Sequence, residues 1–439
     1  MTKKSSVPSP FSNGDSTYRI LLWRLMPVLM LCYIMNYLDR SNIGMAKLQF
    51  LRDLGMRETA YGLAAGSFYL GYILFGVPVN LVLGKIGARP SLLIIMTLWG
   101  LLSASLAFIT SPGHFYAIRF LIGVAEAGFL PAVLLYLSRW IPQSQRARFN
   151  GIFLSAIAIA GLIGGPLGGY IMTLGNGLFG LRGWQALFLL EGLPSCAIGL
   201  TAYFYLKERP RDAAWLTEAQ KREIENDLSA GQPGAPTALQ PVHASLWTAF
   251  QDVRFLSLVA IAIAGAVGTS SIGLWLPSII RETGIHDILV IGVLSAIPNG
   301  AAIFAQYFNA RHSDQTGERR WHAAGPLLAA AAGWCLMPFI SSEPWLSILV
   351  ITFIACATFS FTGPFWSMPT KLLSGTAAAG GLGLITSMIG LGSFLSPVIM
   401  GWLIDRTHTM AAGEIYLAVV LFLGGAALLL GIRADKVPV

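Results

Sequence analysis

Charged residues are scarce in this chain of 439 residues, because Asp, Glu, Lys and Arg together make up only 11% of it. A soluble protein carries about 25% of these residues, so a soluble fold is excluded. The apolar residues, 55% of the chain, occur in twelve long runs: 21–43, 60–83, 91–110, 114–138, 149–172, 184–206, 252–280, 288–309, 322–341, 345–367, 378–402 and 413–432. Each run has at least the ~20 residues that a membrane-spanning helix needs. In lipid, runs of this length satisfy their backbone groups as helices, so the sequence predicts an all-α membrane protein.

The sequence also lacks the residue patterns of enzymes and metal centres. Its four cysteines (Cys32, Cys196, Cys335 and Cys356) all fall within predicted spans and form no Cys-x-x-Cys pair, which favours small buried side chains. No cluster of metal ligands, nucleophile–base pair or appended soluble domain is visible. We therefore expect no metal, no cofactor and no enzymatic or sensor activity. The polar N-terminus leads into a full-length span without a cleavage site, so the first helix is expected to be an uncleaved anchor.

The formal net charge of +8 indicates topology rather than a nucleic-acid partner. Most of the 29 lysines and arginines lie in the tails and in loops on the same predicted side as both termini. The opposite side holds Lys47, Arg52, Arg57, Arg182, Arg281 and Arg406, and Arg24, Arg40 and Arg119 lie within spans. Because lysine and arginine concentrate in cytoplasmic loops, both termini are expected in the cytoplasm, in a multi-pass protein of the plasma (inner) membrane.

The chain divides into two halves of six spans each. Its predicted parts are a cytoplasmic tail (1–20), a first bundle (21–206), a cytoplasmic linker (207–250), a second bundle (251–433) and a short cytoplasmic tail (434–439). The linker begins with a charged stretch that could form a surface helix and continues in Pro- and Gly-rich sequence. Gly- and Arg-containing turns follow the second and eighth spans, and Gly-rich spans with one proline occur fifth and eleventh. Such internal repeats are typical of transporters.

The chain resembles the major facilitator superfamily from about residue 20 to 432. Four strings resemble its anion:cation symporter family in particular: NYLDRSNIG (36–44), SFYLGYILFGVP (67–78), RFLIGVAEAGFLPA (119–132) and GWQALFLLEGLPS (183–195). The resemblance implies twelve transmembrane helices in two pseudo-symmetric six-helix bundles, with a cavity between them. Members of that family carry sugar acids such as galactonate, tartrate, phthalate or hydroxyphenylacetate.

Four ionised side chains lie inside apolar runs: Asp39 and Arg40 in the first, Arg119 and Glu126 in the fourth. Left unpaired, they would cost roughly 10 kcal/mol on insertion scales, so they must pair or face water. Arg119 and Glu126 are seven residues apart and project from one face of a helix. Asp39 and Arg40 are consecutive, about 100° apart, so that Arg40 can face a cavity while Asp39 contacts a neighbouring helix or Arg119. Such residues mark an ion or substrate path.

These residue types fit proton-coupled transport of an anion. Arginine stays charged and can hold a carboxylate through two parallel hydrogen bonds, so Arg40 and Arg119 are candidate substrate-binding residues; alternatively, they only neutralise Asp39 and Glu126. All six histidines lie in loops or at span edges, which leaves Asp39 and Glu126 as candidate proton carriers. The family resemblance implies the same roles for these four positions, and adds Tyr72 as a substrate contact.

The identity of the anion is less constrained. The string ITSMIGLGSF (385–394) in span eleven offers Ser387 and other hydroxyls but no amide, which disfavours a heavily hydroxylated cargo. Trp275 and Trp366 could form aromatic walls for a planar carboxylate, or could simply pack between helices. We therefore predict uptake, by a monomer, of an aromatic or hydroxyl-poor carboxylate. Two alternatives remain. One is uptake of a sugar acid or tartrate-like hydroxy acid. The other is antiport of a drug or metabolite, because the glycine-rich run 161–169 resembles a motif of drug–proton antiporters. Glu191, a fifth acid within a span, is expected to have a structural role.

Overall fold

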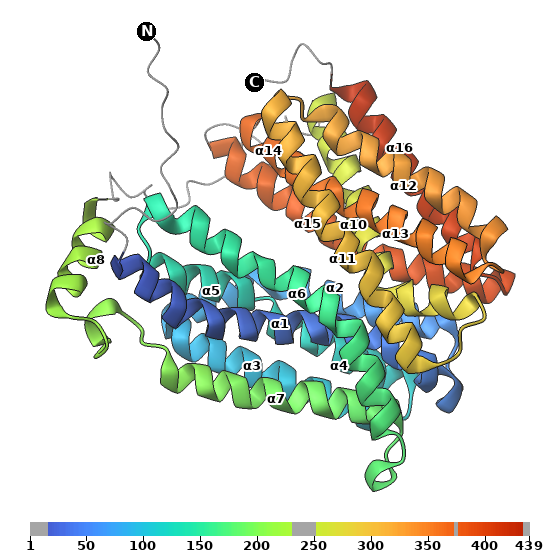
Figure 1. Ribbon diagram of the computed structural model, residues 1–439, viewed down its shortest axis with the longest axis horizontal. Helices are drawn as coiled ribbons and strands as arrows, with labels where there is room; N and C mark the ends of the chain where they lie inside the picture. Colours follow the sequence, from blue (N-terminus) through green and yellow to red (C-terminus); the bar gives the residue numbers. More distant parts are fainter. Residues whose placement is uncertain (1–15, 231–251, 373–375, 433–439) are drawn as a thin grey trace.

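The computed structural model describes residues 16–230, 252–372 and 376–432. Within these residues, twelve helical segments are long and apolar enough to cross a membrane. They form two bundles, one from each half of the chain (Figure 1). The predicted all-α, twelve-helix fold is therefore confirmed. The predicted tail 434–439, most of the tail 1–20 and the Pro-rich second part of the linker lie outside the described residues.

The first bundle contains six spans, one of them divided between two helices: α1 (Ser16–Asp53), α2 (Glu58–Ile86), α3 (Ala88–Ser105), α4 (Pro112–Glu126) with α5 (Phe129–Ser138), α6 (Gln143–Gly175) and α7 (Gly183–Tyr205). The second bundle repeats this pattern: α10 (Val253–Glu282), α11 (Ile288–Thr316), α12 (Arg320–Ile340), α13 (Pro344–Ser360) with α14 (Thr362–Leu372), α15 (Thr376–Thr407) and α16 (Ala411–Gly431). Between the bundles, α8 (Glu218–Ala230) forms the charged first part of the linker.

The fourth span is interrupted at the same place in each bundle, and proline explains both breaks. Pro131 lies three residues into α5 and Pro364 three residues into α14. A proline lacks the N–H that would bond the carbonyl four residues earlier, and its ring crowds that carbonyl. For Pro364 the freed carbonyl is that of Ser360, which instead accepts a hydrogen bond from Asn309 Nδ2 at 2.9 Å. In the first bundle, the break directly follows Glu126.

A tight turn connects the second and third spans of each bundle, as the repeat predicts. Gly87 precedes α3 with φ of 104°, and Gly317 precedes α12 with φ of 70°, backbone conformations that glycine adopts without strain. A carboxylate caps the next helix in both bundles. Glu208 accepts from the backbone N–H groups of Ala88 and Arg89, and Glu318 accepts from those at the start of α12.

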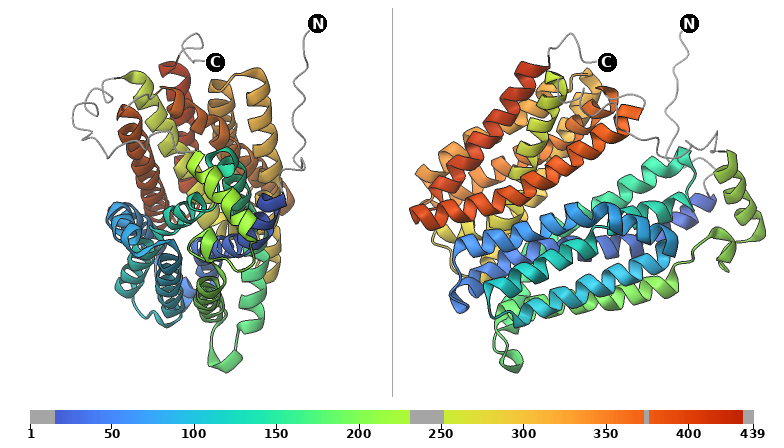
Figure 2. Two further views of the ribbon diagram at one scale, coloured as in Figure 1. Left: turned by 90° about the vertical axis from the view of Figure 1, so that its left-hand side faces the viewer. Right: turned by 180° about the vertical axis from the view of Figure 1, so that it is seen from behind.

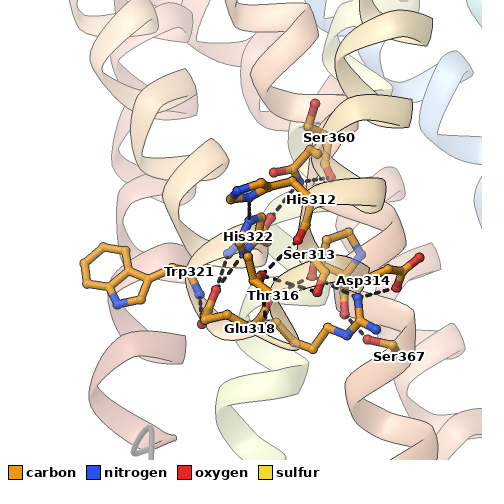
Figure 3. A network of polar contacts seen from close by, with 12 residues as sticks. His312, Ser313, Asp314, Thr316, Glu318, Trp321, His322, Ser360 and Ser367 are labelled. Carbon is orange, nitrogen blue, oxygen red and sulfur yellow. Dashed lines mark hydrogen bonds and ion pairs between the residues drawn. The ribbon is translucent and has the colours of Figure 1, made fainter. Parts of the chain in front are cut away.

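The turn before α12 contains a network of polar contacts (Figure 3). Glu318 Oε1 accepts from the backbone N–H of Trp321 at 2.7 Å, and Glu318 Oε2 lies 2.7 Å from His322 Nδ1. His322 Nε2 in turn lies 2.6 Å from His312 Nδ1. Burial favours the neutral carboxyl, but the hydrogen bonds from Trp321 and His322 outweigh it and lower the pKa of Glu318. The carboxylate therefore holds α12 at its N-terminus.

Replacing Glu318 with Ala should loosen the first turn of α12 by about 1 kcal/mol, the usual effect of removing a cap. Because the pKa of Glu318 is lowered in the folded state, its contribution is present at neutral pH and disappears below its ordinary range near 4. Hydrogen exchange at the Trp321 and His322 amides measures the effect. Glu218→Ala, which removes an exposed acid from α8, is the control, and unchanged exchange in Glu318→Ala would contradict the capping role.

The bundles are joined at the end opposite the termini and diverge toward the end where the termini and α8 lie (Figures 1 and 2). Three sets of hydrogen bonds link them at the joined end. Tyr61 donates to the Leu274 carbonyl at 2.8 Å, and Arg281 donates to the Leu48 carbonyl at 2.6 Å. Asp405, near the end of α15, accepts from the backbone N–H of Thr59 at 2.7 Å. Across the described residues, no hydrogen bond links the bundles at the diverging end.

Glycines allow close approach where α6 meets α11. A Cβ at Gly165 would lie 2.9 Å from the Ser295 side chain, and a Cβ at Gly169 would lie 2.8 Å from the Ile288 carbonyl. The glycine-rich run 161–169 therefore has a packing function between the bundles.

Lys47 corrects one prediction. The sequence placed it in a loop outside the first span, but α1 continues to Asp53 and buries Lys47 at 4% exposure. Its Nζ pairs with Glu58 at 2.8 Å and lies 3.7 Å from the centre of the Trp275 ring. The length of α1 could not be predicted from hydropathy, because this ion pair and cation–π contact compensate the charge at the joined end.

Candidate functional site

The central feature of the first bundle is an ion pair between α1 and the end of α4. Arg40 Nε donates to Glu126 Oε2 at 2.7 Å. The Glu126 side chain is fully buried, whereas 25% of the Arg40 side chain remains exposed. Glu126 Oε1 has no hydrogen-bond partner. The predicted approach of α1 and α4 is thus present at this pair, and part of the Arg40 side chain remains accessible.

Aromatic rings surround the Arg40 guanidinium. Its central carbon lies 5.2 Å from the ring centres of both Phe68 and Tyr72, and 6.0 Å from that of Tyr37. A cation over aromatic faces is stabilised by the ring quadrupole without losing its charge. Tyr72, which the family resemblance proposed as a substrate contact, therefore lies beside the proposed anion-binding group.

Asp39 points away from Arg40, as the helical geometry predicts. It is 1% exposed, and its Oδ1 accepts a hydrogen bond from Ser103 on α3. Its Oδ2 has no hydrogen-bond partner. One face of α1 thus presents a cation toward α2 and α4, and another face presents an acid toward α3.

Arg119 is buried at 1% exposure and lies against Phe68, with its central carbon 5.1 Å from the ring centre. Its Nε and Nη1 have no hydrogen-bond partner. A buried cation with two unused donors is costly unless an anion can be offered to it. Each of the two acids interacts electrostatically with both arginines.

In this arrangement, the charged groups can exchange partners. Arg40 carries donors beyond the one that Glu126 uses, and a forked guanidinium can bind a second carboxylate. Glu126 and Asp39 each have one oxygen without a partner, which can accept a proton. The cluster therefore offers cationic groups for an anion and acidic groups for protons within one bundle.

The residues proposed as aromatic walls and hydroxyl contacts lie in the second bundle. Trp275 is fully buried (0% exposed) beneath Lys47 and packs edge-on against Tyr61, at the joined end of the bundles. In this conformation it lines no open surface, and its role as an aromatic wall stays a prediction. Trp366 is 38% exposed and contacts the Phe365 ring. Ser387 is partly buried and donates to the Gly383 carbonyl of its own helix at 3.0 Å.

Two members of the cluster were not found from the sequence. Ser103, which donates to Asp39, is one of several small polar residues in an apolar span, and nothing in its spacing marks it. Phe68 lies between Arg40 and Arg119, but an aromatic residue in a span is usually a packing residue. Only the three-dimensional packing of α1, α2, α3 and α4 reveals these two roles.

Comparison with known proteins identifies the family. A model described as "Major Facilitator Superfamily" matches residues 29–397. The chain belongs to the major facilitator superfamily. Among superfamily members, a putative tartrate transporter of Agrobacterium vitis is 39% identical over 95% of this chain and 91% of its own length. A quinolone resistance transporter of Acinetobacter baumannii is 36% identical over 92% of each chain.

A crystal structure of a D-xylose–proton symporter has the same fold, with a TM-score of 0.74 at 16% identity, covering 95% of this chain and 99% of that one. The curated relatives, such as the tartrate transporter of Agrobacterium vitis, support the resemblance to the anion:cation symporter family within the superfamily. The protein is thus a multi-pass membrane transporter and not an enzyme.

Proposed function

We propose that this transporter takes up an organic carboxylate together with protons, by symport across the plasma membrane. The observation that supports this most strongly is the Arg40–Glu126 pair, a partly exposed cation held at 2.7 Å by a fully buried acid. Arg119, buried with two unused donors, lies in the same cluster. An anion crossing a medium of low dielectric constant needs such cationic partners.

The proposed cycle follows from competition for Arg40. A substrate carboxylate that binds the guanidinium takes over part of the charge that now stabilises ionised Glu126. Glu126 then accepts a proton, because an isolated charge on a buried acid is unfavourable. Substrate and proton therefore load together. When the substrate leaves, Arg40 and Glu126 pair again and the proton is released.

The two bundles supply the proposed alternation of access. The hydrogen bonds at Tyr61, Arg281 and Asp405 close the end opposite the termini. If the lysine and arginine distribution places the termini in the cytoplasm, this conformation is closed to the outside and faces inward. Breaking these contacts while closing the diverging end would present the cluster to the outside. We expect this cycle to operate in a monomer, because each bundle pair holds one complete cluster.

For the substrate we favour an aromatic or hydroxyl-poor carboxylate. Tyr37, Phe68 and Tyr72 form an apolar surround for Arg40. The hydroxyls of Thr386 and Ser387 already donate to carbonyls of their own helix, which leaves few groups to satisfy a polyhydroxylated cargo. A tartrate-like hydroxy acid is the alternative that the relative from Agrobacterium vitis supports.

Benzoate and L-tartrate, tested on the purified full chain in lipid nanodiscs, distinguish these substrates. Benzoate should raise the unfolding temperature in a saturable manner, whereas benzamide, which has the same ring without the charge, should not. Accumulation of the binding carboxylate in proteoliposomes with an alkaline interior then tests proton-coupled uptake. A stronger shift with tartrate would favour the hydroxy acid, and no shift with any carboxylate would contradict the proposed cargo class.

Export by antiport is a second candidate, because one relative is named as a quinolone resistance transporter. Quinolone antibiotics are themselves planar aromatic carboxylates, so the same arginines could bind them. The direction of coupling separates the two functions. Symport requires the carboxylate and protons to move the same way, whereas antiport would alkalinise the compartment that the drug enters.

A further inference from the structure

Glu191 is a buried acid that the proposed cycle does not use. It lies in α7, is 3% exposed, and its Oε2 has no hydrogen-bond partner. In a membrane span, an acid of this kind is expensive to keep unless it is paired, protonated or functional. Its neighbours therefore decide which of these conditions applies.

Two independent contacts place Glu191 beside the Asp39 region. Ser103 on α3 donates to Asp39, and the next residue, Ala104, lies against α7. A Cβ at Gly192, which directly follows Glu191, would lie 2.7 Å from the Ala104 backbone nitrogen. The helices α3 and α7 thus touch at the level of both acids.

Asn42 forms the second link. It follows Asp39 by three residues on α1, is 4% exposed, and lies close to both Asp39 and Glu191. Neither its amide nitrogen nor its oxygen is in good hydrogen-bonding geometry. Asn42 is therefore a buried amide between two buried acids, and each of the three side chains retains an unused polar atom.

The charges around the two acids differ. Asp39 is close to the cations Arg119 and Arg40, whereas the one charged group that acts on Glu191 among the described residues is Asp39 itself. On α1, which packs against α7, Arg40 is paired with Glu126. The charged residues of α3 and α6 lie in their first two turns: Arg89 in α3, Arg146 and Arg148 in α6. On α1, Lys47 is paired with Glu58 and Asp53 with Arg182.

We propose that Glu191 is a second proton-binding site inside the membrane, coupled to Asp39 across Asn42. Two acids that share a buried region cannot both be ionised without strong repulsion. With Asp39 compensated by arginines, Glu191 holds the proton in the conformation described here. When Asp39 takes up a proton during transport, the repulsion vanishes and Glu191 can release its own proton to water or to a neighbouring site.

The consequence for transport, which rests on the proposed function, is that proton occupancy is set by two linked acids on the α3–α7 side of α1. Arg40 and Glu126 bind the anion on the other side. The transporter would then bind its cargo at one group of residues and part of its protons at another, and α1 would connect the two groups.

Infrared difference spectroscopy of the full chain in nanodiscs tests the proton site without any substrate. The wild type should show the carbonyl stretch of a protonated carboxyl that disappears as pH rises. Glu191→Gln should remove the component of that band that Glu191 contributes, seen as a difference from the wild type. Glu414→Gln, which changes another acid buried at 4% exposure in α16, should remove only its own contribution and leave the Glu191 component in place.

Asp39→Asn tests the coupling even if Glu191→Gln fails to fold. Removing the Asp39 charge should change the proton concentration at which the band disappears by about tenfold, equivalent to ~1.4 kcal/mol. A band that is unchanged in Glu191→Gln, that is absent from the wild type, or whose Glu191 component does not respond to Asp39→Asn would overturn the proposal. These spectra do not depend on transport, so a failed uptake assay would count against the symport proposal alone.

Discussion

Arg40→Ala and Arg119→Ala should each abolish carboxylate uptake. Arg40 provides the partly exposed cationic side chain of the cluster, and Arg119 provides buried donors that have no other partner. Truncating one member of a buried charge pair costs about 2–5 kcal/mol, so the apparent affinity for the carboxylate should fall about 30-fold or more. Saturable uptake into proteoliposomes, together with thermal shifts by the same carboxylate, measures this loss.

Two controls separate binding from folding. Arg40→Lys keeps the positive charge but loses the planar fork that holds two oxygens at once, so it should bind weakly while remaining folded. Arg24→Ala removes an exposed arginine near the start of α1, outside the cluster, and should transport normally. Wild-type kinetics in both alanine variants of the cluster would show that Arg40 and Arg119 serve only to neutralise the acids.

The fold could be predicted from the sequence because hydropathy reports directly on it. Twelve runs of the required length can form only a helical membrane protein, and the repeated Gly- and Pro-containing segments predicted two matching bundles. The interrupted fourth spans were not predicted, although Pro131 and Pro364 cause them. Proline is common in transmembrane helices, so its presence alone does not distinguish a break from a continuous span.

The candidate site was predicted only in part, because sequence shows residue types but not how they pack. Charged residues in apolar runs are conspicuous, so Asp39, Arg40, Arg119 and Glu126 could be found without a structure. Their partners are ordinary residues: Ser103 and Phe68 acquire their roles only from packing. Trp275 shows that residue type alone does not give exposure, because this aromatic residue, suited to a binding wall, is covered by Lys47 at the joined end of the bundles.

Glu126→Gln and Asp39→Asn should uncouple transport from protons while keeping substrate exchange. The amides preserve size and can still accept hydrogen bonds, so Arg40 and Ser103 retain partners at these positions. Neither amide can take up and release a proton in the physiological range. A pH gradient of one unit supplies about 1.4 kcal/mol per proton, enough for roughly tenfold accumulation of a cargo that moves with one net proton.

The two variants should therefore equilibrate the carboxylate across proteoliposomes without concentrating it. Counterflow of labelled against unlabelled carboxylate should persist, because it needs binding and alternation but no net proton movement. Ser103→Ala is the matched control: it removes a hydrogen bond to Asp39 but leaves the carboxyl itself, and should still accumulate cargo. If both amide variants concentrated the carboxylate as the wild type does, the protons would have to bind at other groups, and the competition between substrate and Glu126 for Arg40 would not be the coupling step.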